Sequence, residues 1–227
     1  MQVVDEPVRI PVGTAELAGE LEVPAGADAL VLFAHGSGSS RHSPRNRFVA
    51  ESLRWRGVGT LLFDLLTPEE EEEDMRTGRL RFDVHFLAER LIEVTDWVRA
   101  DPRVRDMGFG YFGASTGAAA ALIAADERPE VRAVVSRGGR PDLAGPALAR
   151  VRAPTLLIVG SNDMPVTEWN ASALAQMHCE RDLQIISGAT HLFQEPGALE
   201  RVAELAGSWF ERYASRRGEL AARRRAS

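Results

Sequence analysis

The stretch GFGYFGASTG, residues 108–117, decides the fold, and its last five residues form a G-x-S-x-G pentapeptide around Ser115. The aromatic and glycine residues before Ser115 predict a short buried strand, and the alanine-rich run 117–125 after it predicts a helix. A serine on so sharp a strand-to-helix turn adopts strained backbone angles, and its hydroxyl projects above the sheet. Gly113 and Gly117 would keep this turn free of clashes. The stretch therefore predicts a nucleophile at Ser115.

The same residues contain a second pattern, G-x-G-x-x-G at 108–113, which binds dinucleotides when a buried strand precedes its first glycine. The preceding residues, RVRD at 103–106, are too few and too charged for such a strand. We therefore expect these glycines inside the aromatic strand. The start of the following helix points free N–H groups toward Ser115, which suits developing negative charge.

Composition indicates one ordinary globular domain. The chain has 227 residues, 44% of them hydrophobic and 26% charged, which is enough for one sizeable α/β core. The net charge of −6 disfavours nucleic acid as a partner. All 27 basic residues are arginine, so arginines near any one site carry less weight than usual.

The first residues and the cysteine count bear on cellular location and redox chemistry. Residues 1–6 show neither the basic nor the apolar part of a secretory signal, and no charge-free run is long enough to span a membrane. We therefore expect a cytoplasmic protein that does not bind membranes. Cys179 is the only cysteine, which excludes an intrachain disulfide.

Apolar runs alternate with helical patterns along the chain. Strands are expected before Ser115 and at 3–12, 15–23, 29–34, 59–64, 131–136, 154–160 and 183–186. Helices are expected after Ser115 and at 44–55, 82–99, 142–150, 167–178 and 197–214. This alternation predicts a mostly parallel sheet of about eight strands with helices on both faces. We expect one domain over 1–214 without a separate cap, and a basic tail over 215–227. The acidic run 69–74 is expected to be a solvated loop or helix start.

A serine hydroxyl needs a base, and the base needs an orienting carboxylate. Functional groups gather at the carboxyl ends of parallel strands, so the residues just past each strand are the candidates. Asp163 follows the strand at 154–160, and His191 follows the strand at 183–186. The order serine, aspartate, histidine fits this assignment. Asp64 also ends a strand and is the alternative acid, although it precedes the nucleophile.

The remaining histidines fit the role of base less well. His85 and His178 fall in expected helices, and His42 comes too early in the chain. His35 precedes the glycines of the loop after the strand at 29–34, and we expect it to hold that loop in shape. No metal-binding spacing of histidine, glutamate or cysteine is present in the sequence.

Two amides and two arginines complete the expected site. The backbone N–H groups of Thr116 and Ser37 are the candidates for stabilising an oxyanion. Arg137 follows the strand at 131–136, and Arg41 lies in the loop that carries Ser37. We expect Arg137 and Arg41 to bind the carboxylate of an anionic substrate, since arginine holds carboxylates with two parallel hydrogen bonds.

Four motifs give the chain a family resemblance: FAHGSGSS at 33–40, GASTG at 113–117, GSNDMP at 160–165 and GATHLF at 188–193. Over nearly its whole length the chain resembles the compact α/β-hydrolases of the dienelactone-hydrolase-like group. The resemblance implies a single-domain α/β-hydrolase fold. Dienelactone hydrolases themselves use a cysteine nucleophile, whereas this chain has serine, which favours general carboxylic esters over lactones.

The expected activity is a serine esterase that cleaves small esters through an acyl-enzyme on Ser115, His191 and Asp163, without a cofactor. Related acyl chemistry on the same residues is the alternative: a thioesterase, amidase, lactonase or acyltransferase. A non-catalytic binding module with the same fold is a second alternative, because a fold alone does not dictate function.

Overall fold

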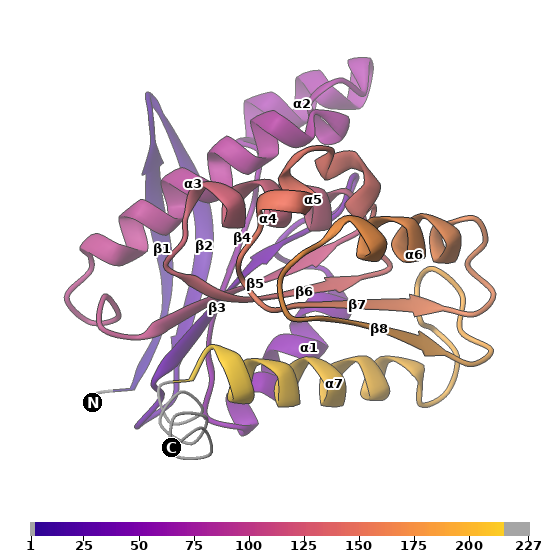
Figure 1. Ribbon diagram of the computed structural model, residues 1–227. Coiled ribbons are helices and arrows are strands. Elements are labelled where there is room, and N and C mark those ends of the chain that lie inside the picture. The colour runs from indigo at the N-terminus through magenta and orange to yellow at the C-terminus, as the bar shows by residue number, and fades with distance from the viewer. Residues whose placement is uncertain (1–2, 216–227) are drawn as a thin grey trace.

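Within residues 3–215, which the computed structural model describes, eight strands form one sheet in the order β1-β2-β4-β3-β5-β6-β7-β8 (Figure 1). The strands are β1 (Val4–Val12), β2 (Ala15–Val23), β3 (Ala29–Ala34), β4 (Gly59–Phe63), β5 (Gly108–Ala114), β6 (Val131–Arg137), β7 (Thr155–Gly160) and β8 (Arg181–Ile186). β1 and β2 form an antiparallel hairpin, and β2 is antiparallel to β4. The pairs from β4 through β3 to β8 are all parallel.

Helices cover both faces of this sheet (Figure 1). They are α1 (Pro44–Trp55), α2 (Pro68–Thr77), α3 (Val84–Ala100), α4 (Thr116–Glu127), α5 (Ala147–Arg150), α6 (Val166–Gln176) and α7 (Ala198–Tyr213). Two short 3₁₀ turns, η1 (Leu80–Phe82) and η2 (Pro141–Ala144), connect them. α1 and α7 pack together on one face, while α3, α4 and α6 lie on the other. The predicted fold class is confirmed.

The central strands are apolar because both of their faces are covered. Every residue of β3, β4, β5 and β7 is buried. In the hairpin, by contrast, exposed and buried residues alternate along the outer part of β1, as expected for a strand with one solvated face. The carboxyl ends of the parallel strands lie along one edge of the sheet, and the loops that follow them build the site described below.

The acidic run at 69–74 forms the start of α2, one of the two forms that the sequence predicts. α2 begins at Pro68 after a capping box formed by Thr67 and Glu70, and Glu69, Glu71, Glu72 and Glu73 are exposed. Asp74 is buried rather than solvated, because it accepts hydrogen bonds from the backbone N–H groups of Leu80 and Arg81 and pairs with the Arg81 guanidinium.

Two further points concern the ends of elements. The helix expected at 142–150 is split into η2 and α5, because Gly145 has a positive φ of 52° and Pro146 follows it. The basic tail expected at 215–227 lies outside the described residues from 216 onward.

Among the residues described, no helix has both the length and the apolar character required to cross a lipid bilayer.

Candidate active site

Ser115 lies at the turn between β5 and α4, with φ of 52° and ψ of −122°. A positive φ is strained for any residue with a side chain, and such strain concentrates at functional sites. Three backbone hydrogen bonds hold the turn: Ser115 N–H donates to the Arg137 carbonyl at 3.3 Å, and the Ser115 carbonyl accepts from Arg140 at 3.0 Å and Ala118 at 3.1 Å. The surrounding backbone therefore imposes the strained conformation.

Only glycine fits without a clash at positions 113 and 117, on either side of Ser115. A Cβ on Gly113 would lie 2.8 Å from the Ala118 nitrogen, inside the first turn of α4. A Cβ on Gly117 would lie 2.5 Å from the His35 carbonyl oxygen and closer still to that of Ala34. α4 thus packs directly against the end of β3, as the pentapeptide predicts.

His191 and Asp163 are in direct contact. His191 Nδ1 lies 2.7 Å from Asp163 Oδ2, and the aspartate is buried while the histidine side chain is 39% exposed. Because Nδ1 is held by the carboxylate, it donates its proton there and the other ring nitrogen, Nε2, is left to accept one. The carboxylate therefore sets both the tautomer and the orientation of the imidazole.

The loops after β7 and β8 are tied to each other next to this pair. The Asn162 N–H donates to the Ala189 carbonyl at 2.9 Å, and the Asn162 side chain donates to the Gly188 carbonyl at 3.0 Å. A Cβ on Gly160 would lie 2.6 Å from the Ala189 carbonyl carbon, so the loops could not approach so closely with a larger residue. This contact fixes the loop of Asp163 against the loop of His191.

Ser115 and His191 line the same pocket, which has a volume of about 270 Å³. The loop after β3 forms one wall with Gly36 and Ser37, and Arg45 and Arg137 form another. The structure therefore brings the predicted nucleophile, base and acid into one site, together with Ser37 and Arg137.

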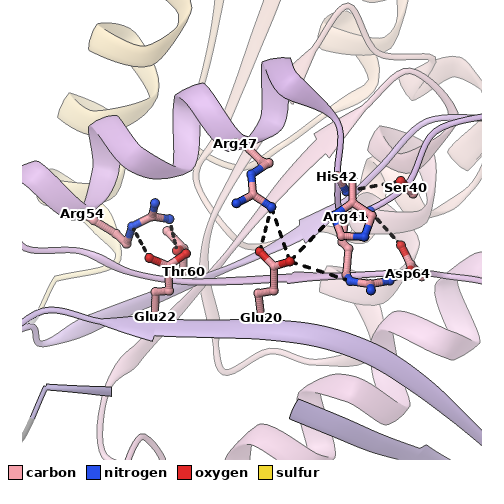
Figure 2. A network of polar contacts seen from close by, with 9 residues as sticks. All are labelled: Glu20, Glu22, Ser40, Arg41, His42, Arg47, Arg54, Thr60 and Asp64. Atoms are coloured by element: carbon pink, nitrogen blue, oxygen red, sulfur yellow. Dashed lines mark hydrogen bonds and ion pairs between the residues drawn. The ribbon is translucent and has the colours of Figure 1, made fainter. Parts of the chain in front are cut away.

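Asp64 and Arg41 are engaged elsewhere (Figure 2). The Asp64 carboxylate accepts the Arg41 N–H at 2.7 Å and pairs with the Arg41 guanidinium. Arg41 also lies 3.9 Å from Glu20, which pairs with Arg47 at 3.0 Å and lies 3.8 Å from His42. Neither Asp64 nor Arg41 lines the pocket of Ser115 and His191, so the structure does not place Arg41 in the site where it was expected to bind substrate.

His35 holds the loop after β3, as its position in the sequence predicts. Its Nε2 accepts the Leu65 N–H at 3.0 Å, and its Nδ1 lies 3.0 Å from the Gly36 carbonyl, to which it donates. Burial lowers the pKa of His35 below 6.5, so the ring is neutral at pH 7. With both ring nitrogens occupied, His35 is a structural link between β3 and β4.

The two expected oxyanion donors are linked to each other. The Ser37 N–H donates to the Thr116 hydroxyl oxygen at 3.0 Å. This bond ties the loop after β3 to the first residue of α4, and it occupies the Ser37 amide in this structure. The sequence did not predict this hydrogen bond, because the spacing of residues does not relate the side chain of Thr116 to the backbone of Ser37.

Arg137 is a buried cation without a carboxylate partner among residues 3–215. It is 6% exposed, its guanidinium donates one hydrogen bond to Asn46 Oδ1 at 3.3 Å, and its Nε has no partner. Burial and the nearby charge of Arg45 lower the pKa of Arg137 to about 10, so it stays protonated at pH 7. Its guanidinium also lies 6.0 Å from the centre of the Phe193 ring.

Arg45 adds a second positive charge to the same wall. It is the second residue of α1, after the helix cap formed by Ser43, and its buried Nε also has no hydrogen-bond partner. Two arginines therefore line one pocket, and neither forms an ion pair with a carboxylate of residues 3–215. From this part of the chain the sequence favoured Arg41 rather than Arg45.

Histidine, cysteine and acidic side chains do not form a group of three that could hold a metal ion in residues 3–215. The ionisable groups at the pocket are instead the Asp163–His191 pair and the two arginines. This arrangement can activate a hydroxyl, receive a proton and hold an anion.

Comparisons with known proteins agree with the fold. The profile described as the dienelactone hydrolase family matches residues 55–216. The crystal structure of a dienelactone hydrolase from Anabaena variabilis is 58% identical, with a TM-score of 0.92 over 94% of this chain and 100% of that one. Est1E from Butyrivibrio proteoclasticus is 18% identical, with a TM-score of 0.73 over 90% of this chain and 97% of the other, and shows the same fold.

Two curated proteins from strains of Mycobacterium tuberculosis are 56% identical over 207 residues. They carry the provisional name phosphoribosyl transferase. The match covers 91% of this chain but 46% of theirs, so the chain spans under half the length of these relatives.

Proposed function

Because the chain belongs to the dienelactone hydrolase family, we propose that it is a serine hydrolase that cleaves small carboxylic esters through an acyl-enzyme. One observation carries the proposal: a strained Ser115 shares its pocket with a histidine whose Nδ1 is held by a buried aspartate. Strain at the nucleophile and a fixed tautomer at the base both serve attack on a carbonyl carbon.

The reaction proceeds in two halves. Ser115 Oγ attacks the ester carbonyl carbon while His191 Nε2 takes the hydroxyl proton, and Asp163 stabilises the imidazolium. The ester C–O bond then breaks, and His191 returns the proton to the departing alkoxide, which leaves as the alcohol. A water molecule repeats these steps on the acyl-enzyme and releases the acid, so the enzyme returns unchanged.

The oxyanion is held by amides at the start of α4 and in the loop after β3. The Thr116 N–H belongs to the first residue of the helix and needs no intrahelical partner. The Ser37 N–H rests on the Thr116 hydroxyl before substrate arrives. In the proposed reaction Ser37 turns from this neutral acceptor to the charged oxygen, since a bond to a charged group is roughly twice as strong.

The preferred substrate carries an anion that Arg137 and Arg45 bind. Burying a cation without a partner is unfavourable, and an arriving carboxylate or phosphate would supply the missing hydrogen bonds. Both anions match the planar donor fork of arginine. The name of the mycobacterial relatives is the reason to include phosphate in the test.

A fluorophosphonate probe tests the nucleophile. We expect one adduct per folded chain in the intact mass spectrum and none on Ser115→Ala. A folded wild-type protein without an adduct would favour a non-catalytic binding module. If the adduct forms and simple esters are not cleaved, thioesters, amides and lactones become the substrates to assay.

Arg137→Met tests whether Arg137 binds an anionic group of the substrate. We expect wild-type kcat/KM to be higher for an ester with a free carboxylate or phosphate than for a neutral ester of equal length. The variant should lose that preference and keep most of its rate on the neutral ester. Arg47→Met is the matched control, since Arg47 pairs with Glu20 away from the pocket. Equal losses on both kinds of ester would make Arg137 a support of its loop only.

A further inference from the structure

A second cavity, of about 210 Å³, lies next to the catalytic pocket and has no part in the steps above. It shares Gly36, Ser37 and Ser39 with that pocket, so the loop after β3 borders both. Its other walls come from the end of β4 and from α2 and α3. We call it the leucine cavity, after Leu65, Leu66 and Leu87 in its lining.

The leucine cavity begins beside the nucleophile. Gly36 lines it, and a Cβ on Gly36 would lie 2.9 Å from the Ser115 Cβ. The sheet order puts it on a defined side: β3 and β4 lie on one side of the serine strand β5, and β6 with Arg137 lies on the other. A substrate bonded to Ser115 can therefore extend one part toward Arg137 and another toward the leucine cavity.

The lining is mostly apolar. Leu65 and Leu87 are buried, Leu66 is half-buried, and Met75 of α2, the fourth large apolar side chain in the lining, is exposed. Such a surface favours an uncharged group, because each apolar group that leaves water contributes free energy in proportion to its area.

Asp74, Arg81 and His35 in the lining already have partners. Asp74 accepts hydrogen bonds from Leu80 and Arg81 and pairs with the Arg81 guanidinium. His35 is neutral, with both ring nitrogens in use. The remaining charge at the cavity is the exposed carboxylate of Glu71, which repels anions. The leucine cavity thus differs in charge from the arginine wall.

We propose that the leucine cavity is a subsite for the uncharged apolar part of the substrate, opposite the anion-binding arginines. The substrate class is then an ester that joins a short apolar group to an anionic one. The inference rests on the proposed ester hydrolysis. At about 210 Å³ the cavity is smaller than the roughly 300–1,000 Å³ of a site for a drug-sized ligand, so it suits a short chain or one ring.

Two series of esters test the subsite, one lengthening the acyl group and the other the alcohol, with the opposite part held constant. Burial of one methylene is equivalent to about a fourfold gain in kcat/KM. We expect one series to rise by about that factor per methylene and then to level off when the cavity is full. The other series should stay flat, which identifies the part of the ester that enters.

Leu66→Trp fills the cavity and should abolish the rise while the shortest ester keeps its rate. Met75→Trp is the second variant should Leu66→Trp fail to fold, since Met75 is 69% exposed and tolerates a larger side chain. Phe82→Trp is the matched control: Phe82 is exposed on the neighbouring 3₁₀ turn and does not line the cavity. It should leave the length dependence unchanged.

The outcomes separate this inference from the proposed function. A fluorophosphonate adduct with no length dependence in either series would overturn the subsite alone. Equal losses on short and long esters in the filled variant would also overturn it. Failure of the adduct itself would overturn the proposed hydrolysis and the subsite together. A rise that Leu66→Trp removes and Phe82→Trp keeps would support both.

Discussion

Gly117→Ala is the most informative single substitution, because residue 117 contacts no substrate in the proposed reaction. The new Cβ would lie 2.5 Å from the His35 carbonyl oxygen, whereas side-chain carbons stay at least 3.0 Å from such atoms. Both obstacles, the carbonyls of Ala34 and His35, belong to backbone that continues into the buried strand β3. α4 and the loop after β3 must therefore move apart by about half an ångström or more.

The expected magnitudes follow from this displacement. Overpacking a close-packed site costs about 1–3 kcal/mol, and alanine in a helix returns at most about 1 kcal/mol. We expect the free energy of unfolding to fall by about 1–2 kcal/mol, which lowers the Tm by roughly 2–8 °C for a chain of this length. The same shift separates Ser37 from Thr116 and displaces Ser115. Misplacement on the order of 1 Å can reduce a rate about 100-fold, so kcat/KM should fall by more than tenfold.

Gly207→Ala is the matched control. It also places alanine in a helix, but its Cβ would meet the side chain of Arg56 at 2.6 Å, and that side chain, which is partly exposed and paired with Glu211, shifts more easily than backbone. We expect unchanged or slightly increased stability and unchanged activity. The measurements are urea unfolding, the rate of fluorophosphonate labelling and kcat/KM. Wild-type stability and labelling rate in Gly117→Ala would refute the reasoning, because the loop could then yield without consequence.

Three further predictions concern the site and its support. Asp163→Asn should reduce kcat by about ten-thousand-fold in a folded protein, because it changes the contact with His191. Asp64→Asn, which disturbs the bond to Arg41, should reduce kcat far less, and the reverse result would make Asp64 the orienting acid. The pKa of His35 is lowered by burial, so as the pH falls the unfolded chain binds the proton at a higher pH than the folded one does. The free energy of unfolding therefore falls below pH 6.5 by up to about 1.4 kcal/mol per pH unit. In urea titrations His35→Gln should show a shallower fall than wild type, and an equal slope would contradict this. Thr116→Val removes the acceptor that the Ser37 amide leaves in the proposed reaction, so kcat should rise by about two- to twelvefold, the equivalent of one hydrogen bond, and Thr116→Ser should restore the wild-type rate; a slower valine variant would mean that the hydroxyl is needed to position the loop of Ser37.

Most of the sheet could be predicted because its strands are continuous apolar runs that end in small-residue loops. β3, for instance, occupies the predicted residues 29–34, and α1 the predicted residues 44–55. The predictions were least detailed in polar segments. For the acidic run both a loop and a helix start were expected, and the structure has the helix start because Thr67 and Glu70 form its capping box, whereas Asp74 is buried against Arg81. Sequence periodicity does not reveal such pairings, which depend on the path of the chain.

The site residues, too, were predicted well where the sequence places them after a strand and less well where tertiary contacts decide their role. Asp163 and His191 could be located because each lies in the loop after a strand, and the structure brings them into contact. The two arginines were harder to distinguish: Arg41 and Arg45 are four residues apart in a chain rich in arginine, yet one is paired with Asp64 and the other has no carboxylate partner in the described chain. The difference depends on what lies across the loop, and it decides which arginine is available to a ligand.

The packing of α7 against α1 has a consequence for synthesis on the ribosome (Figure 1). Among the described elements α7 is translated last, so the part of this face that α7 covers stays exposed until nearly all of residues 3–215 have been translated. A nascent chain that ends before residue 191 contains Ser115 but lacks His191 and the helix that packs with Phe33 and Phe112. Exposed apolar surface of this kind attracts chaperones and promotes aggregation. Ribosome stalling before residue 191 should therefore yield an insoluble product in which Ser115 lacks its proposed base, and its hydroxyl is as unreactive as that of any surface serine.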